Sequence, residues 1–285
     1  MLKTLKFKRE ISYGSFDNAL ESAIDATKLF DKMQEHFEKP NLKKPMLLFI
    51  GYDGCLTNAV AITKENPTSA IGKILKEGAI YIGRTGGERI GDQQTDTAPG
   101  WASIFTGAWG RENGVINNSD VLSEKTKSIM CKLLLKGTSA SFVFSWACHK
   151  EITYNREAKN YPNRYLKAED DEQTLELMRS RLKAGDCAIF GIFEHCDHEG
   201  HKSGFSINNK EYMNALNTSE TYANIIIEDV IARKTYKEED WLILIATDHG
   251  GVRKKHGGRT KMETTIFFAS NKKVFKFDDT SGVFI

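Results

Sequence analysis

The stretch WLILIATDHGG (241–251) decides the fold prediction, because six apolar residues and one threonine are followed by an acid, an imidazole and two glycines. Continuous apolarity, without polar alternation, is typical of a strand buried on both faces of a parallel sheet. The pair Asp248 and His249 lies where such a strand would end. Sheets of this kind bind ligands beyond the carboxyl ends of their strands.

Similar runs recur at 46–50, 79–82, 141–146, 187–193 and 264–270, and helical patterns alternate with them at 100–108, 123–135, 172–184 and 209–233. This alternation predicts an α/β fold, a three-layer sandwich with a central, mostly parallel sheet and helices on both faces. We expect residues 46–285 to form this domain. Residues 1–45 are expected to be an N-terminal helical extension, with a helix from a cap at Ser15 to Phe37 that Pro40 and Pro45 close off.

Composition excludes several function classes. The 285 residues include 40 basic and 38 acidic side chains, so a net charge of +2 gives no field for nucleic acid. No apolar run approaches the ~20 residues of a membrane helix, and the first residues lack the apolar segment of a secretory signal. Five cysteines without a CxxC pair argue against a disulfide framework. We therefore expect a cytoplasmic protein with neither a membrane span nor a nucleic-acid-binding surface, and the oligomeric state stays open.

Acids and imidazoles follow three of the predicted strands. Asp53 follows the run 46–50, the segment 194–201 follows the run 187–193, and Asp248-His249 is followed by His256. Each segment alone is also compatible with an ordinary turn or surface loop. Together, at one edge of a sheet, these side chains suit Zn²⁺, or Mn²⁺ if oxygen ligands dominate.

A fourth segment, TDTAPGWASIFTG (95–107), has the pattern of a helix start. Pro99 suits the first turn and Thr97 the position just before it. A hydroxyl there lies beside unpaired backbone N–H groups that stabilise an anion. A plain cap explains the same pattern. A nearby metal would instead lower the hydroxyl pKa and make Thr97 a nucleophile.

Taken in order, these segments resemble the alkaline phosphatase superfamily, in particular its nucleotide pyrophosphatase/phosphodiesterase-like and sulfatase-like members. The run from Thr97 to Gly107 resembles the nucleophile segment, and residues 194–204 resemble the second-metal loop D-x-x-G-H-x-x-G. Residues 247–250 are similar to the T/S-D-H-G segment, and 256–258 to the H-G that follows it.

The resemblance implies two divalent metal ions, and zinc is the usual metal of the phosphodiesterase-like members. One ion would be held by Asp53, Asp248, His249 and the Thr97 oxygen. The other would be held by Asp197, His201 and His256.

The resemblance also implies a reaction. The phosphoryl group would pass to Thr97, and water would then hydrolyse the phosphothreonine. The Ala98 N–H would stabilise the nonbridging oxygens, and Gly100 occupies a substrate-side position where the phosphodiesterase members tend to have Asn. Thr97 cannot form the formylglycine of sulfatases, which disfavours hydrolysis of sulfate esters by that route.

The function that we expect is metal-dependent hydrolysis of phosphoric esters, of the phosphodiester or nucleotide pyrophosphate type, on a small anionic phosphorylated substrate. A phosphomonoesterase of the same superfamily is the first alternative. A catalytically silent relative that binds phosphorylated ligands is the second. The basic run Arg253-Lys254-Lys255 is either a solvated loop or a source of attraction for such a substrate.

Overall fold

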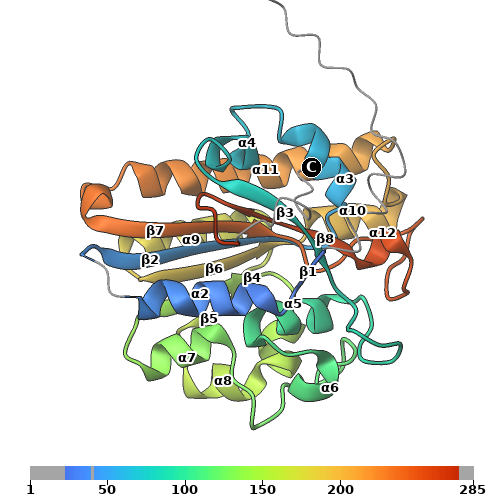
Figure 1. Ribbon diagram of the computed structural model, residues 1–285, viewed down its shortest axis with the longest axis horizontal. Helices are drawn as coiled ribbons and strands as arrows, with labels where there is room; N and C mark the ends of the chain where they lie inside the picture. The colour runs from blue at the N-terminus through green and yellow to red at the C-terminus, as the bar shows by residue number, and fades with distance from the viewer. Residues whose placement is uncertain (1–22, 40–41, 276–285) are drawn as a thin grey trace, which may run out of the picture.

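A computed structural model describes residues 23–39 and 42–275, and its centre is one eight-stranded sheet (Figure 1). In spatial order the strands are β1 (Ile24–Asp25), β3 (Ala79–Arg84), β8 (Thr265–Ser270), β7 (Glu239–Ala246), β2 (Lys44–Tyr52), β6 (Ala188–Phe193), β4 (Ala140–Phe144) and β5 (Tyr165–Lys167). All pairings are parallel except those of β8, which runs antiparallel to β3 and β7. The predicted α/β sandwich with a mostly parallel sheet is confirmed.

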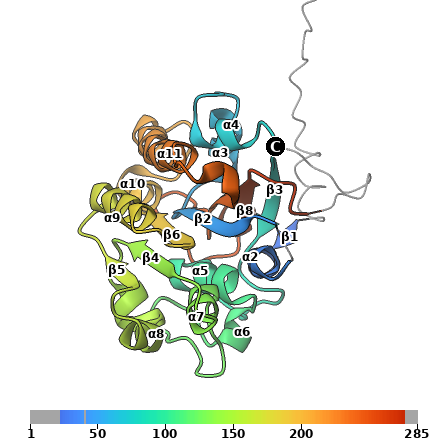
Figure 2. The same ribbon diagram turned by 90° about the vertical axis from the view of Figure 1, so that its left-hand side faces the viewer.

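Helices cover both faces of the sheet, as the end-on view shows (Figure 2). One face carries α3 (Thr57–Thr63), α4 (Ala70–Ile74), α9 (Asp171–Lys183), α10 (His195–Ser203) and α11 (Lys210–Ile231). The other carries α2 (Lys28–Glu38), α5 (Thr97–Thr106), α6 (Gly110–Asn113), α7 (Ile129–Leu135) and α8 (Asn155–Asn160). Shorter elements are η1 (His149–Thr153), η2 (Tyr236–Glu238) and α12 (Lys261–Thr264).

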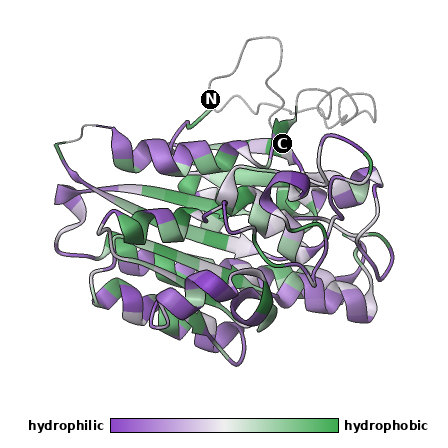
Figure 3. Ribbon diagram, turned by 90° about the horizontal axis from the view of Figure 1, so that it is seen from below, coloured by the Kyte–Doolittle hydropathy of each residue, from purple (hydrophilic) through white to green (hydrophobic). Residues whose placement is uncertain are grey.

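Two apolar cores lie on opposite faces of the sheet, and hydropathy follows this layering (Figure 3). All ten residues of α5 are buried, because the helix lies between the sheet and the outer helices α2, α6 and α7. Trp101 and Phe105 of this helix stack on each other and contact Phe49 of β2. The helix predicted to carry the nucleophile is therefore a core element.

The predicted helix 15–37 is corrected at its start. Its first part, 15–22, and Pro40 lie outside the described residues, and the helix that is described begins only at Lys28. Ile24 and Asp25 instead form the edge strand β1 beside β3. Pro45 lies inside β2 and does not precede it. A proline is tolerated there because the β6 ladder begins only at Leu47, so no partner on that side needs its N–H.

Among the described residues, every helix is too short or too polar to span a lipid bilayer.

Candidate metal centre

The register of the central strands brings three carboxyl groups to one level. Gly51 of β2 pairs with Ile192 of β6 on one side and with Ala246 of β7 on the other. Two residues further along each strand come Asp53, Glu194 and Asp248, all at most 3% exposed. Parallel pairing of buried strands therefore places acids that are far apart in the sequence side by side, at the edge where such sheets bind ligands.

The first predicted ligand group is assembled around His249. Its Nε2 lies 3.5 Å from Asp53 Oδ1 and 3.5 Å from Asp248 Oδ2. The Thr97 Oγ1 lies 3.4 Å from both Asp53 Oδ1 and His249 Nε2. Asp53, Asp248 and His249 offer ligand atoms that all lie within 4.8 Å of one another.

The second predicted group lies against the first. Asp197 and His201 were expected in a loop, but they lie four residues apart in helix α10, so one helix face presents both. His256 Nε2 lies 3.4 Å from Asp197 Oδ1 and 3.0 Å from His201 Nε2. The His249 and His256 rings stack with their centroids 4.0 Å apart. The structure thus brings all seven predicted ligands into one cluster.

Each of the three imidazoles has its Nδ1 engaged outside the cluster. His249 Nδ1 lies 2.8 Å from the Gly250 carbonyl oxygen, and His201 Nδ1 lies 3.0 Å from that of Lys254. His256 Nδ1 lies 3.0 Å from Asp96 Oδ1. Since these partners are acceptors, Nδ1 carries the hydrogen and the Nε2 lone pair faces into the cluster. Histidines that bind metals are held in this way.

The cluster fits divalent cations. Asp248 Oδ2 and Asp197 Oδ1 are buried and make no hydrogen bond with any of the described residues. The Nε2 atoms of His201 and His256 lie 3.0 Å apart, close enough for both to bind one positive charge between them. Carboxylate oxygens and imidazole nitrogens are ligands of zinc and of manganese. The residues present therefore match the metals that the sequence suggests.

The shifted pKa values of the clustered acids and histidines also suit a cation site. Burial, and then the charge of Asp197, raise the pKa of Asp53 to about 8, although the Trp101 hydrogen bond opposes the shift. Burial, followed by the charge of Asp53, raises the pKa of Asp248 well above its usual range. Burial lowers the pKa of His249 well below normal. Burial opposes the charged form of His256 too, but the hydrogen bond to Asp96 and the charge of Asp197 raise its pKa. A bound cation would favour the ionised carboxylates.

The Thr97 helix is positioned by contacts that the motif alone does not show. Thr97 is the first residue of α5, and the residue before the helix is Asp96, whose carboxylate holds His256 and caps nothing. Trp101 Nε1 donates to Asp53 Oδ2 over 2.9 Å. A Cβ at Gly100 would lie 2.8 Å from the Asp248 carbonyl oxygen, so this glycine lets the helix approach the end of β7.

The two residues predicted to bind substrate are placed at this helix start. The Ala98 N–H donates to Asn118 Oδ1 over 2.8 Å, and Gly100 faces the Asp248 backbone. The sequence analysis missed Asn118, which lies in the segment between α6 and α7. It also missed Asp96 and Trp101 as partners of His256 and Asp53.

Glu194 is a further residue that the sequence analysis did not single out. Its Oε1 is buried and has no hydrogen-bond partner in the part of the chain that the structure describes. Burial, together with the charges of Asp53 and Asp171, raises the pKa of Glu194 well above normal. Asp171 accepts hydrogen bonds from the backbone N–H groups of Glu194 and His195. The strand register, which makes Glu194 level with Asp53, is the signal that would have found it.

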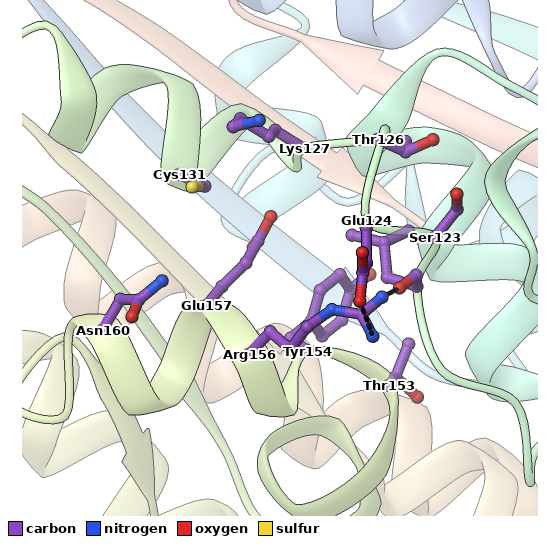
Figure 4. A pocket seen from close by; sticks show the side chains of 11 residues that line it. Ser123, Glu124, Thr126, Lys127, Cys131, Thr153, Tyr154, Arg156, Glu157 and Asn160 are labelled. Atoms are coloured by element: carbon purple, nitrogen blue, oxygen red, sulfur yellow. Dashed lines mark hydrogen bonds and ion pairs between the residues drawn. The ribbon is translucent and has the colours of Figure 1, made fainter.

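A separate pocket of about 190 Å³ lies between the segment 122–127, α7 and α8 (Figure 4). Its lining mixes Lys127 and Arg156 with Glu124 and Glu157, and Arg156 reaches across to Glu124. None of the predicted site residues lines it. The metal cluster therefore remains the candidate site.

No family model and no curated protein matches this sequence. Its fold is similar to that of phosphonoacetate hydrolase from Sinorhizobium meliloti 1021, with 12% identity, a TM-score of 0.53, and coverage of 74% of this chain and 57% of that one. It is also similar to murine ectonucleotide pyrophosphatase/phosphodiesterase 5, with 15% identity, a TM-score of 0.53, and coverage of 73% and 58%. The chain thus spans less than two thirds of the length of these two structures.

A third similar structure is the C-terminal periplasmic domain of the phosphoethanolamine transferase EptC from Campylobacter jejuni. It is 18% identical, with a TM-score of 0.52 and coverage of 80% of both chains. The chain has the α/β fold of the alkaline phosphatase superfamily.

Proposed function

We propose that this protein hydrolyses phosphoric esters, of the phosphodiester or nucleotide pyrophosphate type, at a two-metal site with Thr97 as nucleophile. The observation that carries the proposal is the position of Thr97 Oγ1, which lies 3.4 Å from Asp53 Oδ1 and from His249 Nε2. An aliphatic hydroxyl among so many ligand atoms, at the start of a buried helix, suits attack on an anionic phosphorus centre.

In this proposal the ligands divide between two cations as the resemblance implies. Asp53, Asp248, His249 and the Thr97 oxygen would hold one divalent cation, and Asp197, His201 and His256 the other, with zinc favoured and manganese a second choice. When bound, the cations would supply Lewis acidity toward the Thr97 hydroxyl and the phosphoryl oxygens.

The remaining chemistry belongs to the chain. Thr97 Oγ1 forms a bond to phosphorus as the bond to the leaving oxygen breaks, which gives a phosphothreonine. Water then breaks the bond between phosphorus and Thr97 Oγ1 and restores the hydroxyl. The Ala98 N–H and the Asn118 side chain lie beside Thr97, where they can orient the nonbridging oxygens once the hydrogen bond between them opens.

The substrate class is supported by the site and by two similar structures. Ligands with a single tetrahedral anion suit a site that combines cations with a helix start. The murine phosphodiesterase has been solved as an inactive threonine-to-alanine variant with AMP, and the bacterial hydrolase with phosphonoacetate. A threonine at position 97 in this chain disfavours the formylglycine chemistry of sulfatases.

The test is turnover of bis-p-nitrophenyl phosphate compared with p-nitrophenyl phosphate, by zinc-loaded protein, with and without a chelator. We expect diester hydrolysis that the chelator abolishes. The Thr97→Ala variant should lose it while metal still binds, and the exposed control Thr221→Ala should retain it. Acid quenching followed by peptide mass spectrometry should find phosphate on Thr97. Turnover that survives Thr97→Ala would overturn the proposal. Preference for the monoester would favour the phosphomonoesterase, and bound metal without turnover the silent relative.

A cytoplasmic location is part of the proposal. All five cysteines are free thiols, which is the state that a reducing compartment maintains.

A further inference from the structure

A tight turn connects the two segments that supply His249 and His256. Val252 and Lys255 form an antiparallel bridge, with Val252 N–H donating to the Lys255 carbonyl over 2.8 Å and Lys255 N–H donating back over 3.1 Å. Arg253 and Lys254 are the two central residues. The metal cluster therefore has a closed four-residue turn at its side.

Arg253 has an unusual backbone conformation. Its φ is +55°, and among the described residues it is the one non-glycine residue with a positive φ. The left-handed conformation is unfavourable for an L residue, so something in the fold must hold it there.

Two hydrogen bonds provide that constraint. The Arg253 carbonyl accepts from the Phe205 N–H over 2.6 Å, and the next carbonyl, that of Lys254, lies 3.0 Å from His201 Nδ1. Two successive carbonyls of the turn thus face the end of α10. The left-handed residue between Val252 and Lys254 is what turns both of them that way.

His201 depends on this turn more than the other two histidines depend on theirs. Its side chain is 45% exposed, compared with 0% for His249 and 8% for His256. Packing therefore restrains the ring of His201 least. Its Nδ1 has one acceptor, the Lys254 carbonyl, whereas His256 Nδ1 lies near both Asp96 Oδ1 and the Thr95 carbonyl.

We infer that Arg253 is a positioning residue that acts through its backbone: its left-handed conformation aims the Lys254 carbonyl at His201 Nδ1–H and so directs His201 Nε2 toward the cation shared with Asp197 and His256. The inference rests on the metal site of the proposed function. It assigns no role to the guanidinium group. A role in attracting the substrate would need that group and would be lost equally in every substitution of Arg253, whereas the backbone role predicts unequal effects.

The experiment compares Arg253→Gly, Arg253→Asn and Arg253→Val, because Gly and Asn adopt a positive φ readily and a β-branched residue does not. Lys255→Val is the matched control, a basic-to-valine change in the same turn without a positive φ. Zinc binding to the metal-free protein is measured by competition with a chromophoric chelator. We expect Gly, Asn and the control to bind both equivalents within about twofold of the parent. Val should weaken one equivalent by about 10–100-fold, the usual effect of removing a hydrogen bond that orients a metal-bound histidine.

A double-mutant cycle and a metal-free measurement complete the test. In a His201→Ala background, Arg253→Val should cause no further loss, because the two changes act through one ligand. Long-range ¹H–¹⁵N spectra of the metal-free protein should show His201 with its hydrogen on Nδ1 in the parent and in Arg253→Gly, and a mixture of tautomers in Arg253→Val. Equal losses for Gly and Val, or an unchanged His201 tautomer in Val, would overturn the inference. Absence of zinc binding in the parent would overturn the proposed function, while the tautomer still tests the turn.

Discussion

The hydrogen bond between Asp96 and His256 gives the sharpest prediction about metal affinity. Asp96 precedes Thr97, and its Oδ1 lies 3.0 Å from His256 Nδ1. Replacing it with Asn keeps the shape and removes the charge. Losing a carboxylate that orients a metal-bound histidine costs about 10–100-fold in affinity, or about 1.4–2.7 kcal/mol. The Thr95 carbonyl, 3.1 Å from the same Nδ1, remains as an acceptor, so we expect a loss near tenfold.

The loss in Asp96→Asn should depend on pH with a definite sign. The hydrogen bond to Asp96 and the charge of Asp197 raise the pKa of His256 against the effect of burial, and His256 must lose its proton before it can bind metal. The variant has a lower His256 pKa, so fewer protons compete with zinc at acidic pH. This gain partly offsets the weaker orientation. The loss should therefore be full at about pH 9 and smaller at about pH 6.

The assay is zinc competition with a chromophoric chelator at several pH values, with exposed Asp31→Asn as the control for charge alone. The carboxyl titrations of Asp53 and Asp197 are common to all proteins compared, so they cancel to first order. An affinity unchanged within twofold at every pH would refute the reasoning. So would a loss that grows as the pH falls.

Two further predictions concern the stability of the protein. Because burial and Asp197 raise the pKa of Asp53 from 3.8 to about 8, the native state binds this proton more tightly than the unfolded chain does. The unfolding free energy should fall as the pH rises through that range, by at most about 1.4 kcal/mol per pH unit for this group. Urea titrations with a chelator should show that the unfolding free energy depends less steeply on pH in Asp53→Asn. An equal dependence in both proteins contradicts the account. Gly54 and Gly137 both have a positive φ, but a Cβ on Gly54 would lie 2.8 Å from Asp197 Oδ1, whereas Gly137 has open space. In thermal unfolding, Gly137→Ala should lose about 1 kcal/mol of stability, and Gly54→Ala should lose more. Only Gly54→Ala should also weaken zinc binding. Equal effects of the two substitutions on stability and on zinc affinity would refute this.

The sheet could be predicted because its strands are continuous apolar runs, and the elements that were missed lack such a signal. β1 and β5 have two and three residues, too few for any pattern. Helix α10 was expected as a loop because its sequence, HCDHEGHKS, is almost entirely polar. Its buried residues are Cys196, Asp197 and Gly200, and no apolar stripe marks them. The helix packs against α11, and its Asp197 and His201 lie beside His256.

The candidate ligands were accessible to sequence reasoning for a physical reason. Asp53 and Asp248 directly follow buried strands, so topology alone brings them together. Asp96, Trp101 and Asn118 were missed because their roles come from tertiary contacts. Asp96 meets His256 across 160 residues of chain and Trp101 meets Asp53 across 48. Before the fold is known, an ordinary structural role explains each of these residues equally well: a helix start for Asp96, the core for Trp101 and a loop for Asn118.

The distribution of the ligands along the chain has a consequence for folding. Asp53 follows the central strand β2, and His256 comes late in the sequence, beyond β7. In an unfolded chain these groups are scattered, so a cation has little affinity for that state. Free metal at a hundred times its dissociation constant would then add about 2.7 kcal/mol to the free energy of unfolding. The ions would connect residues from the early and the late part of the sequence. Their loss would lower the free energy of unfolding and so expose more of the unfolded chain to proteases.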